Sequence, residues 1–432
     1  MIGGLCMSQA LERVIKRDGI TLHLVPSKKY KTMTFVAKMK APLERETITK
    51  RALLPFILRE STKNYPTRKE LQYKLDDLYG ASLSLDGSKA GSYHVISARM
   101  AVANQKYIQN ESSIISETLH LLYEVLFQPN VDGRTFQQAT VNREKETLRK
   151  QIQSIKDDKT NYAQLRLIDE MCQGEKYQIK SQGYEEDLDD ITAENLFETY
   201  ETFIQKDDLD LYILGDFDDD EMIETVTSIF KQRKFENVND VQGESEHRVV
   251  TSPKKMIEQD KIQQAKLHIG YRTYTTYADQ DYPALVVFNA IFGGYPSSKL
   301  FRHVREKNSL AYYVGSFIES YNGLMFVYSG VAHTDYNKAQ MIIDEQLEQM
   351  RSGEFSEQEM AQAKALIVNG ILETADNAQG LIELLYQTII GQNDRNIDEY
   401  IQQIHSITKE EVVEMANKVK LDTTYVLTSE EA

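Results

Sequence analysis

The densest structural signals of the chain lie in Ala290-Ile-Phe-Gly-Gly-Tyr-Pro-Ser-Ser-Lys-Leu-Phe-Arg-His-Val-Arg-Glu-Lys-Asn-Ser-Leu-Ala-Tyr-Tyr-Val-Gly315. Its glycine pair, Gly293 and Gly294, follows an apolar run and is typical of a helix C-terminus, because glycine adopts positive φ at little cost. Ser297 and Ser298 then supply hydroxyls that can cap a second helix. We expect this stretch to form a helix end, a short second helix and the opening of a strand.

Two polar side chains of this stretch are candidates for a site. Arg305 falls in the last turn of the expected second helix, and Tyr312 lies just inside the strand. A guanidinium offers five donors in a fixed geometry and a phenol offers a hydroxyl, so the pair could hold a peptide carbonyl and the oxyanion of a tetrahedral intermediate. The spacing alone favours a structural explanation instead, in which Arg305 interacts with the helix C-terminus and Tyr312 is a half-buried strand residue.

Outward from this stretch, one order of elements occurs twice: strand, helix, helix, strand pair, long helices, helix, strand. Short similarities support the register. Asp190-Ile-Thr-Ala-Glu-Asn-Leu196 resembles Ser406-Ile-Thr-Lys-Glu-Glu-Val412, and Leu211-Tyr-Ile-Leu resembles Thr424-Tyr-Val-Leu. The pattern indicates an internal duplication with a repeat of about 200 residues, which is too long for a solenoid repeat.

The duplication predicts an α+β fold with two homologous domains, each a mostly antiparallel sheet packed against helices. We expect the first domain at residues 1–230, a polar linker at 231–264 and the second domain at 265–432, a division that suits a chain of 432 residues. Residues 141–174 are amphipathic and predict long helices with a solvated outer face.

The composition excludes several classes of partner. The net charge is -16, whereas nucleic acids and anionic membranes bind clustered cations. No run approaches the roughly 18 apolar residues of a membrane span, and the N-terminus lacks the segments of a signal peptide. Cys6 and Cys172 are the only cysteines, so a disulfide framework is not expected, and Met7 is an alternative start. We expect a cytoplasmic protein.

No metal or nucleophile motif stands out. A helix-borne zinc site needs two histidines three or four residues apart, and no two histidines here are that close. The acidic run Asp216-Phe-Asp-Asp-Asp-Glu221 is explained by a helix N-terminus, where carboxylates face the positive end of the dipole. A ligand set gathered from distant positions stays open. The histidines are His23, His94, His120, His247, His268, His303, His333 and His405.

The opening stretch resembles the C-terminal-domain signature of the pitrilysin/insulinase (M16) family of zinc peptidases. In that signature a Gly-Gly-x-x-Ser-Ser-x-Leu-Phe segment leads to Leu-Arg-Glu-Lys-x-Gly-Leu-Ala-Tyr. The agreement runs from Gly293 to Tyr312 without a gap, and Ser309 stands where the family usually has glycine. The resemblance implies that Arg305 and Tyr312 contact substrate, and that the two domains are arranged as a clam shell.

The catalytic half of the family's site differs here. The inverted zinc motif, His-x-x-Glu-His, lies on the first helix of the first domain, and the resemblance puts Ala52, Pro55 and Phe56 at its three positions. Gln151 takes the place of the distant glutamate ligand, with Glu144 at a second acidic position seven residues earlier. Ala52, Pro55 and Phe56 can neither bind zinc nor act as a base, so we expect no metal in this chain.

The resemblance implies a non-catalytic subunit of a heteromeric zinc metallopeptidase, similar to bacterial and mitochondrial pairs in which one chain carries zinc and its homologue supplies the Arg/Tyr element. Zinc would belong to the homologous partner, a peptide would be the substrate, and this chain would have no independent activity. The alternative is a peptide- or protein-binding or maturation factor of the same fold, gripping its client by a strand edge. Some small paired bacterial members are named for an association with elongation factor P modification. A stand-alone enzyme of another kind gains no support from the motifs.

Overall fold

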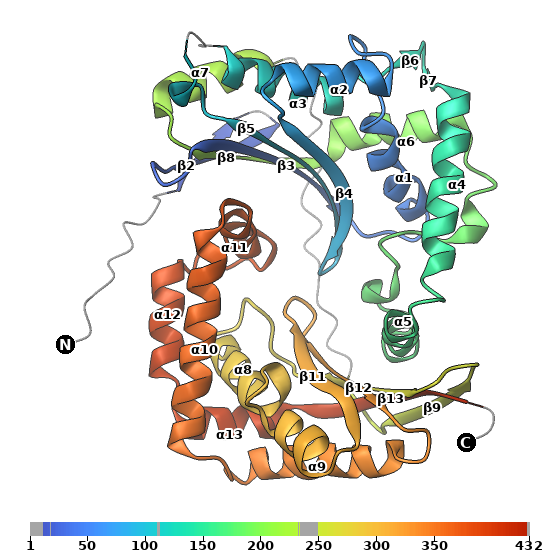
Figure 1. Cartoon of the computed structure of the whole chain (residues 1–432), viewed down its shortest axis with the longest axis vertical. Helices are drawn as coiled ribbons and strands as arrows, with labels where there is room; N and C mark the ends of the chain where they lie inside the picture. Colours follow the sequence, from blue (N-terminus) through green and yellow to red (C-terminus); the bar gives the residue numbers. More distant parts are fainter. Residues whose placement is uncertain (1–11, 18, 110–112, 232, 234–248, 430–432) are drawn as a thin grey trace. The chain divides into compact units, whose positions relative to one another are not determined.

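The computed structural model describes residues 12–17, 19–109, 113–231, 233 and 249–429. The chain divides into two compact units: unit 1 contains Met1–Ile152 and Ile179–Gln242, and unit 2 contains Gln153–Gln178 and Gly243–Ala432. Each unit is a sheet with packed helices (Figure 1). Three sequence expectations lie outside the described residues: the tip with Cys6 and Met7, the part of the linker at 234–248, and His247 within it.

Unit 1 is built on sheet 1, whose described strands lie in the order β1-β2-β8-β3-β5-β4. Neighbours are antiparallel except for β2 and β8, which are parallel. The strands are β1 (Arg13–Arg17), β2 (Ile20–Pro26), β3 (Thr32–Pro42), β4 (Ser82–Ala90), β5 (Tyr93–Ala103) and β8 (Asp208–Gly215).

The helices of unit 1 cover one face of sheet 1 and bury the first hydrophobic core with it (Figure 1). Residues such as Phe35 of the sheet and Leu53, Leu122 and Phe203 of the helices are fully buried there. The helices are α1 (Ile48–Leu58), α2 (Arg68–Asp77), α3 (Ile114–Phe127), α4 (Gln138–Ser154), α6 (Ala193–Lys206) and α7 (Asp219–Phe230), with a small hairpin of β6 (Val131–Asp132) and β7 (Thr135–Phe136).

Unit 2 repeats this plan. Sheet 2 has the described order β11-β12-β10-β13-β9, antiparallel throughout except for the parallel pair β13 and β9. Its strands are β9 (Lys254–Gln259), β10 (Ala265–Arg272), β11 (Ala311–Glu319), β12 (Leu324–Val331) and β13 (Lys420–Thr428). Its helical elements are α5 (Lys159–Met171), α8 (Tyr282–Asn289), η4 (Ala290–Gly294), η5 (Phe301–Lys307), α9 (Tyr336–Arg351), α10 (Glu357–Asp376), α11 (Ala378–Ile390), α12 (Ile397–Ser406) and α13 (Lys409–Lys418).

The two sheets share one topology, which explains the repeated sequence pattern. Read from the parallel pair, the order β2-β8-β3-β5-β4 matches β9-β13-β10-β12-β11 strand for strand. The two similar heptapeptides both start helices: Thr192 and Thr408 each form a capping box with the residue three positions later. An α+β fold with two sheets packed against helices is thus confirmed, and the structure adds one parallel pair to each sheet.

Two details differ from the sequence expectation. The helical residues 141–174 break after Ser154, and Asp158 caps a new helix, α5, through the N–H groups of Thr160 and Asn161. This helix packs on sheet 2, on the face opposite α9 (Figure 1). In addition, β9 lies inside the stretch expected to be linker.

Candidate functional site

The stretch from Ala290 to Gly315 leaves regular structure three times. Both η4 and η5 are π-helical, whereas the sequence predicted ordinary helices. Ser309 has φ +52°, and the β11–β12 register skips Tyr312, since Ala311 pairs with Val331 and Tyr313 with Gly330. Single π-turns and β-bulges concentrate at functional sites because they redirect individual side chains.

Glycine is required at positions 293 and 294 for a different reason from the one expected. Neither Gly293 nor Gly294 is in the positive-φ region, so the expectation of a left-handed helix end is wrong. A Cβ on Gly293 would lie 2.4 Å from Oγ of Ser316, and one on Gly294 would lie 2.9 Å from Nδ2 of Asn289. Glycine is needed here because a side chain at 293 would collide with Ser316 of β11, and one at 294 would collide with Asn289 of α8.

Arg305 and Tyr312 both point to the surface of unit 2. Arg305 lies in the last turn of η5, is exposed, and places its guanidinium carbon 4.7 Å from the ring centre of Phe301. The Tyr312 side chain is 64% exposed, as expected for a bulged residue. The half-buried position that a purely structural role predicted for Tyr312 is therefore wrong.

The elements that carry the pair are firmly held. Oγ of Ser298 accepts from the N–H of Phe301 at 3.4 Å, as predicted for a capping serine. Arg302 of η5 forms an ion pair with Glu359 of α10. Burial raises the pKa of Glu359, but hydrogen bonds from Ser356 and Arg302 outweigh it and bring the pKa to about 2. The carboxylate thus stays charged and anchors η5 at neutral pH.

The positions expected for zinc ligands lie on α1 of unit 1. Ala52 and Pro55 are buried and Phe56 is half-buried, with the guanidinium carbon of Arg59 4.6 Å from the Phe56 ring centre. Pro55 is inside the helix, so it removes one backbone donor as well. These side chains present hydrocarbon where the motif would present two imidazoles and a carboxylate.

The second pair of expected positions lies on α4. Glu144 is buried and accepts from Nε of Arg143 at 2.7 Å, while Nη2 of Arg143 donates to Glu60 at 2.5 Å. Glu60 lies two residues after Leu58, the last residue of α1, so this arginine joins the end of α1 to α4. Gln151 is exposed on the last turns of α4.

Comparisons with known proteins agree with this geometry. A family model described as "Peptidase M16 inactive domain" matches residues 190–367. A Bacillus subtilis (strain 168) protein named "Probable inactive metalloprotease YmfF" is 45% identical over 421 residues, which is 98% of both chains. The chain belongs to the M16 peptidase family.

Two further comparisons give one solved structure and one relative that is named a zinc protease. The crystal structure of a conserved protein from Enterococcus faecalis V583 has a TM-score of 0.89 and 33% sequence identity, covering 98% of this chain and 99% of that one. "Uncharacterized zinc protease YmxG" of Bacillus subtilis (strain 168) is 24% identical over 169 residues, 38% of this chain and 41% of the relative. The resemblance in the sequence is confirmed: the chain is a homologue of the inactive kind.

Zinc, the metal of M16 peptidases, does not fit the residues at the motif positions. A methyl group, a pyrrolidine ring and a phenyl ring offer no lone pair to a cation. Across the described residues, no three His, Cys, Asp or Glu side chains are grouped so that they could hold a metal ion. We therefore derive no step through zinc for this M16 chain. No described helix is long and apolar enough to cross a membrane.

The structure contains a buried ionic group beside the degenerate motif that was not predicted from the sequence. Nη1 and Nη2 of Arg51, on α1, donate to the two carboxylate oxygens of Asp207 at 3.1 and 2.7 Å, and Nε donates to Nδ1 of His94 at 3.2 Å. Burial, together with the charge of Arg51, lowers the pKa of His94 to about 3. The helical period of α1 alone favours an inward position for Arg51. Because arginine is mostly found at the surface, the residue type argues against burial.

Proposed function

We propose that this chain is the non-catalytic subunit of a heteromeric M16 zinc metallopeptidase. The proposal rests on one contrast. Arg305 lies on a π-helix and Tyr312 at a β-bulge, and both side chains are exposed. The zinc positions, in contrast, have the apolar residues Ala52, Pro55 and Phe56. A chain that had lost all peptidase chemistry would have no need for a π-helix and a bulge at the first pair. Substrate binding is the role left to that pair.

The chemistry assigned to the pair is hydrogen bonding. The Arg305 guanidinium would donate to backbone carbonyls of an extended peptide and fix its register. The Tyr312 hydroxyl would donate to the scissile carbonyl oxygen, which becomes an oxyanion as water adds. A donor aimed at that oxygen is typically worth a factor of about 10² to 10³ in rate. The zinc ion and the base that activates water would come from a homologous partner.

Bacillus subtilis supplies support for such a pairing. One relative there is named a probable inactive metalloprotease and another a zinc protease, so both kinds of homologue occur in one organism. A partner with the same two-sheet plan would need the intact His-x-x-Glu-His motif and the distant glutamate ligand to complement this chain. We place the complex in the cytoplasm because the sequence contains only two cysteines, which is typical of proteins in a reducing compartment.

The test is identification of the partner. The tagged full chain would be expressed at native level in its own cells, purified, and weighed by native mass spectrometry. We expect a one-to-one complex with a homologue that carries His-x-x-Glu-His and one zinc ion per complex. Tyr73→Phe, at an exposed position of unit 1, serves as the control for recovery of the complex. A monomer or a homodimer without zinc would contradict the proposal.

The second candidate is a binding or maturation factor without a peptidase role, in keeping with the family members named for elongation factor P modification. The edge of sheet 1 favours it: among the described strands β4 pairs only with β5, so its outer edge is available to an extended chain. Recovery of an unrelated client in stoichiometric amount, with no zinc-bearing homologue, would favour this candidate over the first.

A further inference from the structure

Helix α5 belongs to unit 2, although residues of unit 1 precede and follow it in the sequence. Its apolar face is buried on sheet 2, opposite the main core of that unit. The sheet contributes Leu324 and Phe326 of β12 and Tyr425 and Leu427 of β13. The helical segment contributes Ala163, Leu167, Ile168, Met171 and Cys172. Without α5, the apolar surface that these four residues of sheet 2 form would be open.

The fit of α5 on the sheet depends on a glycine. A Cβ on Gly270 of β10 would lie 2.4 Å from Sδ of Met171 and 3.6 Å from Cδ1 of Leu167. A larger residue at this position would force the Met171 side chain or the helix itself to move, because the contacting atoms belong to the buried face of α5. Gly270 thus allows the close approach of α5 to the sheet.

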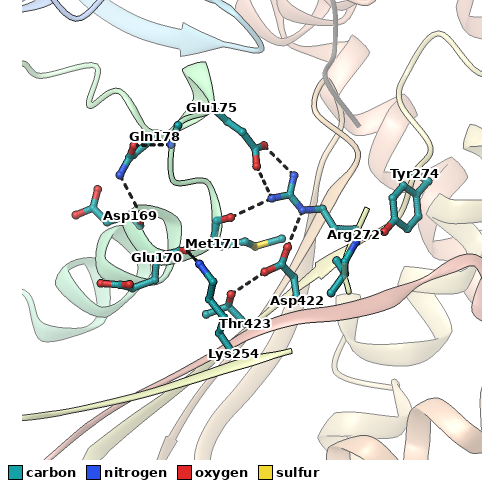
Figure 2. Close-up of polar contacts among 12 residues, drawn as sticks. Asp169, Glu170, Met171, Glu175, Gln178, Lys254, Arg272, Tyr274, Asp422 and Thr423 are labelled. Carbon is teal, nitrogen blue, oxygen red and sulfur yellow. Dashed lines mark hydrogen bonds and ion pairs between the residues drawn. The ribbon is translucent and has the colours of Figure 1, made fainter. Parts of the chain in front are cut away.

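A buried arginine of β10 binds the C-terminal end of α5 and the turn after it, as Figure 2 shows. Arg272 is 3% exposed, and Nη1 and Nη2 donate to the two carboxylate oxygens of Glu175 at 2.8 and 2.6 Å. Its Nε donates to Asp422 of β13 at 2.9 Å, and Nη2 also donates to the carbonyl oxygen of Met171 at 3.0 Å. One side chain of β10 therefore holds both the end of α5 and the turn after it.

A second set of contacts holds the helix along its length. Glu258 of β9 accepts from the hydroxyl of Tyr162 at 2.6 Å and from Nε of Arg166 at 3.0 Å. Nζ of Lys254 donates to the carbonyl oxygen of Glu170 at 3.1 Å (Figure 2). These bonds all run between the segment and sheet 2.

We propose that residues 153–178 form a strap that opens and closes on sheet 2 as a separate step from unfolding of the sheet, with the Arg272–Glu175 contact as its lock. The sheet itself is held by strand pairing and by the core on its other face, neither of which needs α5. The strap is held by one apolar helix face and by the bonds to Glu175, Glu258 and Lys254. Further side-chain contacts to unit 2 join Lys159 to Asp260, Thr160 to Tyr313 and Gln164 to His268. Opening uncovers the apolar patch of Leu324, Phe326, Tyr425 and Leu427. The proposal does not depend on the peptidase role.

Cys172 gives a direct readout of opening. It is fully buried at the C-terminal end of α5, and the chain has one other cysteine, Cys6. In the full chain with Cys6→Ser, the rate of labelling by a thiol reagent under native conditions reports exposure of Cys172. Glu175→Gln removes the negative charge from the contact with Arg272. Gly270→Ala disturbs the packing of α5 on β10 and changes no charge. The controls are Glu170→Gln on the same helix and Leu148→Ala in the core of unit 1.

We expect labelling to accelerate about tenfold or more in Glu175→Gln, the usual effect of losing a charge-assisted hydrogen bond, and to accelerate in Gly270→Ala as well. Both controls should keep the parent rate, and amide exchange in β10, β12 and β13 should stay slow in both strap variants. Unchanged labelling in both strap variants would overturn the proposal. So would equal acceleration by Leu148→Ala, or exchange of the sheet 2 amides that rises in step with labelling.

Discussion

Oγ of Ser316 donates a hydrogen bond to Oδ1 of Asn289 at 2.6 Å. Asn289 is the last residue of α8, directly before the π-helical η4, and Ser316 lies on β11 four residues after Tyr312. This bond joins the two residues that directly flank the stretch from Ala290 to Gly315. The serine hydroxyl also fills the space beside Gly293, so the bond and the glycine depend on each other.

Gly293→Ala should destabilise unit 2. The added methyl carbon would lie 2.4 Å from Oγ of Ser316 and 2.9 Å from Cδ1 of Leu300. Overpacking of this kind costs about 1–3 kcal/mol, which urea denaturation followed by circular dichroism can measure. Gly370→Ala on α10 is the matched control, because its methyl would meet only the Tyr295 hydroxyl at 3.8 Å. That control should gain about 0.5–1 kcal/mol from helix propensity. Equal effects at both sites would contradict close packing at Gly293.

Ser309→Gly should stabilise the chain. Ser309 has φ +52°, a region that costs a residue with a Cβ about 1–2 kcal/mol, and part of the gain is offset by the greater freedom of glycine in the unfolded chain. We expect a net gain of about 0.5–1 kcal/mol in the free energy of unfolding. Ser309→Val should lose stability, since β-branched residues tolerate this region poorly. Destabilisation by glycine would show that the serine side chain matters more than the strain.

Two buried histidines should make the fold sensitive to acid. Burial, with the charge of Arg51 for His94 and of Lys266 for His268, lowers both pKa values to about 3. An unfolded histidine has a pKa of about 6.5, so between about pH 6.5 and 3 the unfolded chain binds protons that the native chain does not. Stability therefore falls as the pH falls, by up to about 1.4 kcal/mol per pH unit for each histidine.

His94→Gln should flatten this dependence, measured as urea midpoints between about pH 7 and 4. His23 works in the opposite direction. Despite its burial, hydrogen bonds to Asp210 and Glu12 raise its pKa, so its contribution is complete below about pH 6.5 and disappears as the pH rises through the folded value. An unaltered slope in His94→Gln would disprove a neutral buried His94.

Arg51→Met should be more harmful than removal of the whole ion pair. Asp207 is 1% exposed and burial raises its pKa even though Arg51 opposes the rise, so its carboxylate depends on Arg51 for charge compensation. Breaking one side of a buried pair costs about 3–5 kcal/mol, while replacing both sides by apolar groups is often neutral. The double variant Arg51→Met with Asp207→Leu should recover much of the loss in urea denaturation. No recovery would mean that the two residues act independently.

The sequence predicted much of the fold but less of the site's shape. Capping residues such as Thr192 and Thr408 and the buried strand tyrosines Tyr212 and Tyr425 are local signals, and they placed both repeats correctly. The π-helices and the bulge at Tyr312 were not predicted, because helix period and strand alternation do not report such local departures from regular backbone geometry. The transfer of α5 to unit 2 was also missed, since the partners of Leu167 and Arg272 are distant in sequence.

The roles of the zinc positions and of Arg305 and Tyr312 rested on family resemblance, and the structure adds the physical context. Spacing alone favoured a packing role for Tyr312, and exposure removed that explanation. The reason for the usual glycine at position 309 is now visible as a positive φ, which serine adopts here under strain. Helix period cannot report such a backbone angle, so only the resemblance drew attention to Ser309.

The measurement that tests the account most directly is peptidase activity of the full chain, alone and mixed with a zinc-bearing homologue that has an intact His-x-x-Glu-His motif. The account predicts no activity alone, activity in the mixture, and a loss of about 10² to 10³ in kcat/KM with Arg305→Ala or Tyr312→Phe. Lys307→Ala on η5 and Tyr73→Phe at an exposed position of unit 1 should keep the full rate. Strong zinc-dependent activity of the chain alone, or a mixture unaffected by the Arg305 and Tyr312 variants, would contradict it.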